Sequence, residues 1–171
     1  NGNGTTPNLK GIVATVGAFT PVASGISDAS IYDLFVKVSE AITVGGGSKY
    51  APNFGLMNIT DINLMKLKKD ANENYVLPPF VDRSGNQVDG ISIVEDNVVV
   101  ANTMYLGDSR FARIYERTGI DISTGLVDAQ FTSDEMTLKV RKRMAFLIRT
   151  VDQTGFKKVT SISAALVTLA T

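Results

Sequence analysis

The chain contains no cysteine and no histidine among its 171 residues. Without cysteine, it has no disulfides, no thiolate nucleophile and no cysteine-based zinc site. Without histidine, it lacks the commonest general base, the Ser-His-Asp triad and the ligands of nearly all zinc sites. Carboxylate, lysine and tyrosine chemistry is still available, but the two absences favour a non-enzymatic protein that needs no metal or cofactor.

The net charge is zero, because 17 basic residues balance 17 acidic ones. The overall electrostatics therefore do not indicate binding to nucleic acid or to a membrane surface. No apolar run approaches the ~20 residues that a membrane-spanning helix needs. The chain begins Asn-Gly-Asn-Gly without a methionine, and we expect a fragment or a processed product. Its length suffices for one core or two small subdomains.

The most informative feature that is present is an alternating segment at 136–148. Its even-numbered positions, apart from Lys142, are apolar: Met136, Leu138, Val140, Met144, Phe146 and Ile148. Its odd-numbered positions include the basic residues Lys139, Arg141 and Arg143. This alternation predicts one long strand over 135–149, whereas typical strands have about five or six residues. We expect its apolar side to pack on its own subunit and the strand to serve assembly.

Helical periodicity is clearest at 28–44, where Ser27 or Asp28 can cap the start and Gly45 the end. The apolar stripe of this helix consists of Ile31, Leu34, Phe35, Val38 and Ile42. Asp33 and Glu40 lie away from that stripe, so we interpret them as part of a solvated face rather than as an acid–base pair.

A second helix is predicted at 60–69, with Thr60 or Asp61 as its cap. Its apolar positions are Ile62, Met65 and Leu67. Residues 58–60 also match the glycosylation acceptor pattern. We favour the interpretation that Asn58 and Thr60 end a strand and cap this helix.

The remaining apolar runs are short and predict strands at 10–19, 54–58, 91–94, 97–101, 103–106, 120–123 and 159–169. Residues 111–117 are either a strand or a short helix. Residues 78–90 form a loop or hairpin tip, because they contain two prolines and the turn pair Asp89-Gly90. The order of elements indicates an α+β fold with a mixed sheet and two main helices.

Two further motifs have less specific interpretations. Residues 45–49, Gly-Gly-Gly-Ser-Lys, have the wrong order for a phosphate loop and follow a helix, so they indicate a helix end and a linker. The basic side of the long strand has three interpretations, namely a solvated face, pairing with acidic residues of a neighbouring subunit, or contact with nucleic acid. No interleaved aromatic residues support stacking on bases.

A series of short motifs follows along nearly the whole chain. In order they are Leu9-Lys10-Gly11-Ile12, Leu56-Met57-Asn58-Ile59-Thr60-Asp61, Leu106-Gly107-Asp108 with Phe111, Ile114-Tyr115-Glu116-Arg117, and the segment from Phe131 to Arg143. Their order and spacing resemble the C-terminal half of tailed-bacteriophage major capsid proteins. That family has the Hong Kong-type fold, which encapsulin shells also use. Ile59 stands where the family usually has proline, and Asn74 where glycine is common.

The resemblance implies a structural subunit of an icosahedral phage or prophage shell, made in the bacterial cytoplasm and located in the virion. Its partners would be copies of itself in pentamers and hexamers, enclosing double-stranded DNA without sequence-specific binding and without a membrane. The implied parts are a peripheral segment at 1–24, an axial domain at 25–118, a peripheral strand and loop at 119–152, and a C-terminal strand at 153–171. Candidate interface residues are Lys139, Arg141, Arg143, Asp82 and Arg83.

Two alternatives belong to other classes. An encapsulin-like shell would hold cargo protein instead of a genome. A carboxylate-dependent hydrolase would need at least two acidic residues converging in one pocket, which a sequence alone does not reveal. The loop at 78–90 is expected to be mobile and, on the resemblance, to point toward a capsomer axis.

Overall fold

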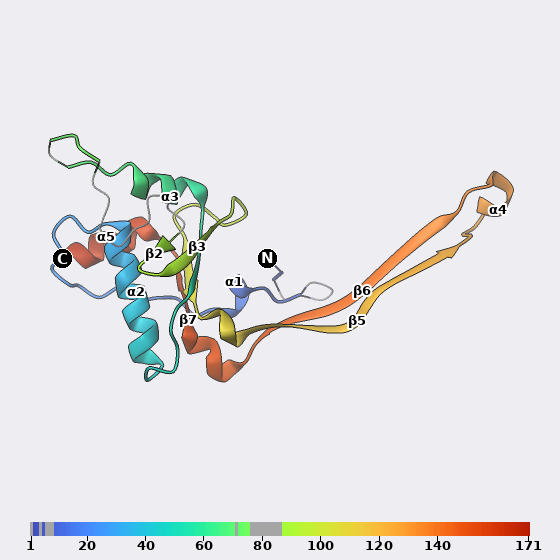
Figure 1. The fold of residues 1–171 in the computed structure, drawn as a ribbon, viewed down its shortest axis with the longest axis horizontal. Coiled ribbons are helices and arrows are strands. Elements are labelled where there is room, and N and C mark those ends of the chain that lie inside the picture. The colour runs from blue at the N-terminus through green and yellow to red at the C-terminus, as the bar shows by residue number, and fades with distance from the viewer. Residues whose placement is uncertain (1, 4, 6–8, 71, 76–86) are drawn as a thin grey trace.

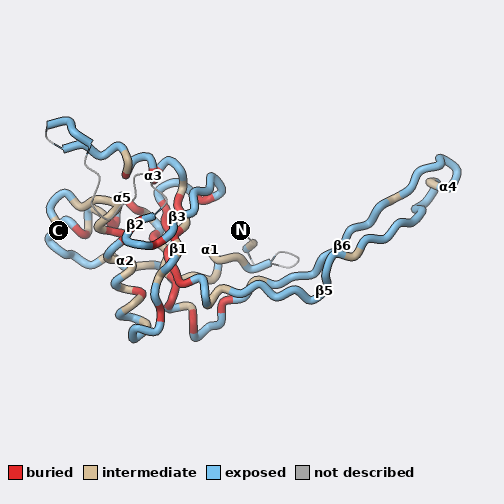
Figure 2. The backbone as a smooth tube through the Cα atoms, in the orientation of Figure 1, coloured by how far each residue is buried: buried red, intermediate tan, exposed pale blue. Residues whose placement is uncertain are grey.

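The computed structural model describes residues 2–3, 5, 9–70, 72–75 and 87–171. A body of sheet and helices continues into a long two-stranded arm that projects away from it (Figure 1). Buried residues gather in the body, whereas the arm is exposed along almost all of its length (Figure 2). The predicted α+β class with a mixed sheet is confirmed.

The sheet of the body has the strand order β2-β3-β1-β4-β7. The central strand β1 runs parallel to β3 and antiparallel to β4, and the other neighbouring pairs are antiparallel. A parallel pair requires a crossover, and helix α3 lies in the connection between β1 and β3. The strand bounds are β1 Phe54–Met57, β2 Gln87–Val88, β3 Ile91–Glu95, β4 Met104–Gly107 and β7 Phe156–Val159.

Helix α2, Ile31–Gly45, confirms the first predicted helix. It begins at Ser30 rather than at Ser27 or Asp28, because the Asp33 carboxylate accepts hydrogen bonds of 2.7 Å from both the Ser30 backbone N–H and its hydroxyl. The predicted stripe faces the core, where four of its side chains are buried: Leu34, Phe35, Val38 and Ile42.

Helix α3, Ile59–Lys66, confirms the second predicted helix but is shorter than expected. Its cap is Asn58, whose side chain accepts a hydrogen bond from the Thr60 N–H at 2.9 Å. Thr60 and Asp61 are therefore not the cap, whereas the interpretation that Asn58 belongs to the strand end and helix cap is confirmed. Asp61 is buried instead, and its carboxylate accepts a bond of 2.8 Å from the Asn102 N–H. The helix buries two of its apolar side chains, Ile62 and Met65.

Two predicted strands are wrong. Residues 10–19 contain a single helical turn, α1 Ile12–Thr15, instead of a strand. Residues 97–101 form turns, in which the Asp96 side chain accepts a hydrogen bond of 2.8 Å from the Val98 N–H. Such local bonds from Asp to the backbone compete with a strand ladder, and short apolar runs carry too few positions to establish a period.

The prediction for the C-terminus is also wrong in part. The chain forms strand β7 and then helix α5, Ile162–Ala170, where a single strand at 159–169 was expected. The Ser161 hydroxyl accepts a hydrogen bond of 3.3 Å from the Ala164 N–H at the start of this helix. Its buried residues recur at helical spacing: Ile162, Ala165 and Leu169. A short apolar segment does not distinguish helix from strand by composition.

The arm consists of strand β5, Ala112–Gly125, and strand β6, Thr137–Ile148, which are antiparallel. Helix α4, Gln130–Ser133, lies at its far end (Figure 1). Two short 3₁₀ helices join the arm to the body, η1 Ser109–Phe111 before β5 and η2 Thr150–Gly155 after β6.

The long strand predicted at 135–149 is confirmed as β6. The runs at 111–117 and 120–123 belong to one strand, β5, whose register shifts between Glu116 and Asp121. These shifts are β-bulges, which interrupt the ladder without ending the strand.

Most of the predicted loop lies outside the described residues, including the candidate interface residues Asp82 and Arg83. The described end of this loop contains the hairpin between β2 and β3. Asp89 and Gly90 have φ angles of 50° and 75°. Two successive positive φ angles define a type I′ turn, so the predicted turn pair is confirmed.

Candidate functional site

The register of the arm sorts its side chains onto two faces, because residues directly opposite each other in a ladder point the same way. Ile114 lies opposite Phe146, and Ile122 opposite Val140. We call this side the apolar face; it consists of Ile114, Ile122, Leu138, Val140, Met144 and Phe146. The other side is the basic face, with Arg113, Lys139, Arg141 and Arg143. The alternation predicted for β6 is therefore confirmed, and Ile114 and Ile122 of β5 extend its apolar side.

Most of the apolar face is left uncovered by the described residues of the chain. Ile122 is 63% exposed and Val140 is 58% exposed, and only the last residue of the strand, Ile148, is buried at the arm's base. The even-numbered side, which we expect to pack on its own subunit, is mostly exposed among the described residues, because the arm leaves the body (Figure 2). Extended apolar patches of this kind mark interaction surfaces.

Lys142 interrupts the apolar series of β6, and the structure explains its position. Its Nζ lies 2.6 Å from the Glu116 carboxylate on the neighbouring strand. Glu116 is paired in the ladder with Met144, so both charges lie on the apolar face. The two charges offset each other there, and the face keeps its apolar character on both sides of the pair.

Among the described residues, the basic face has one ion pair. Arg141 binds Asp121 on the opposite strand, with its Nε 3.1 Å from the carboxylate. Lys139 lies opposite Ser123 and Arg143 opposite Thr118. Within the described residues, neither of these two cations has an ion-pair partner. Arg141 therefore pairs with an acidic residue of its own chain, whereas Lys139 and Arg143 are available to pair with a neighbouring subunit.

A buried carboxylate holds the C-terminal end of the arm, after β6, against the body. Asp152 in η2 is 1% exposed and accepts hydrogen bonds from Lys49 Nζ at 2.7 Å, Arg149 Nε at 2.7 Å and the Tyr50 hydroxyl at 3.0 Å. The bond from Lys49, supported by those from Arg149 and Tyr50, lowers the pKa of Asp152 to about 2. The group is therefore a stable anion at neutral pH.

A second buried carboxylate holds the N-terminal end of the arm, before β5. Asp108, directly before η1, accepts bonds from Arg110 and from the Ala51 N–H at 3.1 Å. Burial opposes its ionisation, but the Arg110 side chain and the two backbone donors outweigh burial and leave the pKa of Asp108 below its usual value. Both ends of the arm are thus bonded to consecutive residues of the body, 49–51.

Two glycines permit this close packing. A Cβ on Gly107 would lie 2.2 Å from the Phe156 ring, and one on Gly155 would lie 2.7 Å from the Tyr50 ring. Sequence reasoning did not identify these positions or the two buried aspartates as an anchor. The sequence indicated this anchor only through the Gly107-Asp108 dipeptide, which belongs to one of the motifs that resemble the capsid family.

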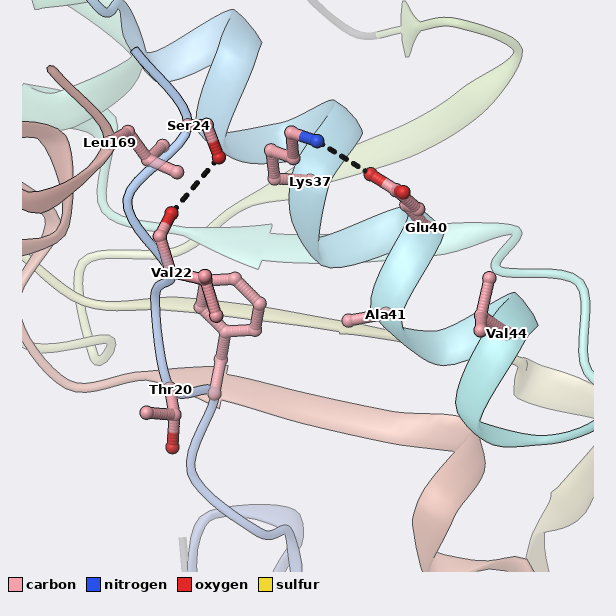
Figure 3. A pocket seen from close by; sticks show the side chains of 9 residues that line it. Thr20, Val22, Ser24, Lys37, Glu40, Ala41, Val44 and Leu169 are labelled. Atoms are coloured by element: carbon pink, nitrogen blue, oxygen red, sulfur yellow. Dashed lines mark hydrogen bonds and ion pairs between the residues drawn. The ribbon is translucent and has the colours of Figure 1, made fainter. Parts of the chain in front are cut away.

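One cavity of the body, about 340 Å³, lies between residues 19–24, helix α2 and Leu169 of α5 (Figure 3). Its lining is largely apolar. Its one carboxylate, Glu40, is bound at 2.9 Å to Lys37 on the same helix. The cavity thus provides an apolar recess with one neutralised ion pair.

A hydrolase that uses two carboxylates needs both of them in one cavity. Each of five cavities lined by described residues has no more than one acidic residue in its lining. The described part of the chain also has no group of three His, Cys, Asp or Glu residues placed to hold a metal ion. This geometry lends no support to the hydrolase alternative. Among the described residues, no helix is both long and apolar enough to cross a membrane.

The sequence profile of the phage capsid family matches residues 1–161. Because that match covers most of the chain, the protein belongs to the phage capsid family. No match was found among curated proteins.

Solved structures give the same fold. The chain is similar to the capsid of an empty GTA particle, with 14% identity over 92% of this chain and 58% of that one, at a TM-score of 0.59. It is also similar to chains of Microbacterium phage Oxtober96 (12% identity, 81% and 50% covered, TM-score 0.59) and Mycobacterium phage Cain (21% identity, 85% and 50% covered, TM-score 0.55). The chain therefore spans between 50% and 58% of their lengths. The expected Hong Kong-type capsid fold is confirmed.

Proposed function

We propose that the chain is a structural subunit of an icosahedral phage or prophage shell and that it acts by self-assembly. The observation that carries this proposal is the exposed apolar face of the arm. A two-stranded ribbon is marginally stable in water unless another layer covers it, and the described body does not supply that layer. Membership of the capsid family makes further copies of the protein the natural source.

The subunits would form pentamers and hexamers. The axial domain, 25–118, would gather around the five-fold and six-fold axes, while 1–24 and 119–152 would lie at the periphery and 153–171 would return to the axial domain. The shell would enclose double-stranded DNA without reading its sequence, which agrees with a net charge of zero. We place the assembled protein in the virion, after synthesis in the bacterial cytoplasm. In such shells many weak contacts, repeated by symmetry, supply the stability.

This proposal gives the protein no enzymatic role and no cofactor. The absence of histidine and cysteine from the sequence supports that view, and so does the separation of carboxylates among the described cavities. The function would reside in the basic and apolar faces of the arm.

The test is to reverse two cations of the basic face, Lys139→Glu together with Arg143→Glu, in the complete gene product. Electron microscopy should show few or no particles, while circular dichroism shows the same folded subunit. The control, Lys139→Arg with Arg143→Lys, keeps both charges and should assemble normally. Particles at normal yield from the reversed variant would refute the assembly role of the basic face. Purified particles should contain double-stranded DNA; a protein cargo in its place would favour an encapsulin-like shell.

A further inference from the structure

Charge is segregated along the arm. Strands β5 and β6, which we call the stem, carry six basic and two acidic side chains, a net charge of +4. The connecting segment 126–136, which we call the tip, carries three acidic side chains and no basic one, a net charge of −3. The acidic residues of the tip are Asp128, Asp134 and Glu135. One arm thus bears two oppositely charged surfaces.

The tip is also apolar, and its shape is held by internal bonds. The Gln130 side-chain oxygen accepts hydrogen bonds of 2.8 Å from the Val127 N–H and from the Thr137 hydroxyl. Phe131 is nevertheless 81% exposed. Its exposed apolar neighbours are Leu126, Val127 and Met136. An aromatic side chain buries about 150–250 Å² when it is fully covered. Contact between the tip and another surface would therefore be stabilised by the burial of Phe131.

A matching hollow lies in the stem. A cavity of about 580 Å³ opens where the β5 register shifts beside Glu116. Its apolar and basic lining includes Leu9, Tyr115, Arg117, Lys142, Arg143 and Met144. Its one carboxylate, Glu116, is occupied by Lys142. Arg117 lies inside the register shift, where a bulge re-aims a side chain. The hollow therefore combines apolar walls with cations that an acidic partner would neutralise.

We propose that the tip of one copy docks in the stem hollow of a second copy. Phe131 would fill the apolar part, and Asp134 and Glu135 would lie beside Arg117 and Arg143. This proposal rests on the proposed function and names one of its contacts. The tip does not reach its own hollow, because the extended strand from Arg117 to Gly125 spans roughly 25 Å. The contact joins two different surfaces of identical chains, and such a contact forms a ring when its rotation closes.

Carbodiimide crosslinking tests the contact directly, since it joins carboxylates to lysine amines only when they touch. An equal mixture of unlabelled and ¹⁵N-labelled chain should give mixed-isotope crosslinks from Asp134 or Glu135 to Lys142. Association with crosslinks only at other positions would overturn the docking and leave the proposed function standing. If the unmodified chain showed no association at any soluble concentration, the proposed function would fail together with this contact.

A charge swap gives a second measurement. Glu135→Lys and Arg143→Glu should each weaken association about fivefold, measured by sedimentation, because each replaces one exposed ion pair with a contact between like charges. The double variant should recover most of the loss, since the pair is restored with its signs exchanged. Glu73→Lys, a reversal on the body, is the matched control and should leave the dissociation constant unchanged. If the double variant instead lost as much affinity as the two single variants together, that result would contradict the docking. Far-ultraviolet circular dichroism of each variant checks that the fold is retained.

Discussion

Lys49 and Asp152 are joined by a hydrogen bond of 2.7 Å, although 103 residues separate them in the sequence. Lys49 follows helix α2, and Asp152 follows the arm. Because Asp108 at the other end of the arm binds the Ala51 N–H, residues 49–51 hold both ends of the arm. These bonds define where the arm leaves the body, and hence how its two faces are presented.

The bond to Asp152 predicts a dependence of stability on pH. The pKa of Asp152 is about 2 in the folded chain, compared with about 3.9 for an unperturbed aspartate. As the pH falls, the unfolded chain binds the proton first, so the stabilisation is present above about pH 4 and is lost toward pH 2. Asp152→Asn should lower the free energy of unfolding at pH 7. The difference in this free energy between the variant and the wild type should shrink as the pH falls from about 4 toward 2.

Urea denaturation of both proteins at several pH values between 7 and 2 measures this difference. Glu73→Gln, which changes an exposed acidic residue of the body, is the control and should stay close to the wild type throughout. A difference between Asp152→Asn and the wild type that stayed constant down to pH 2 would contradict the assignment.

Gly107→Ala should destabilise the chain by about 1–3 kcal/mol, because the new methyl group would overlap the buried Phe156 ring. Gly119 in strand β5 offers a matched control, since a Cβ there would have no neighbour within 4 Å. Gly119→Ala should change the free energy of unfolding by less than about 1 kcal/mol. Thermal unfolding of both variants tests the prediction, and equal effects would show that Gly107 has no packing role.

Truncation of the core stripe should be costly. Leu34 and Phe35 of α2 are almost fully buried, so Leu34→Ala or Phe35→Ala should each lower the free energy of unfolding by roughly 2–5 kcal/mol. Chemical denaturation measures the loss. The exposed Val36 of the same helix is the comparison; Val36→Ala should have a much smaller effect. Similar losses at the buried and exposed positions would argue against the observed packing of this helix.

The apolar face should matter for assembly and little for the isolated subunit. Ile122→Thr with Val140→Thr keeps β-branched side chains on a facing pair but makes them polar. We expect thermal unfolding of the subunit to change little and the yield of particles to fall. Val140→Ile, which keeps the apolar character, should assemble as the wild type does. Undiminished particle formation by the polar variant would show that no partner covers this face.

Local periodicity determined several elements from the sequence alone. Alternation at 136–148 predicted β6, the helical stripe predicted α2, and the Asp89-Gly90 pair predicted its turn. Each of these signals repeats within a few residues, so neighbouring side chains carry the whole pattern. The C-terminal segment lacked such a clear period, and helix α5 was mistaken for a strand. The capping groups of α2 and α3 were also misassigned, because several adjacent polar residues suit the same role.

The tertiary structure alone decided where the surfaces of the arm lie. The sequence determined that β6 has an apolar and a basic face, but only pairing with β5 placed Ile122 beside Val140 and Asp121 beside Arg141. The anchors at Asp108 and Asp152 join both ends of the arm to residues 49–51, and the apolar face beyond them is exposed among the described residues. These features depend on contacts between segments far apart in the chain, which no local pattern encodes.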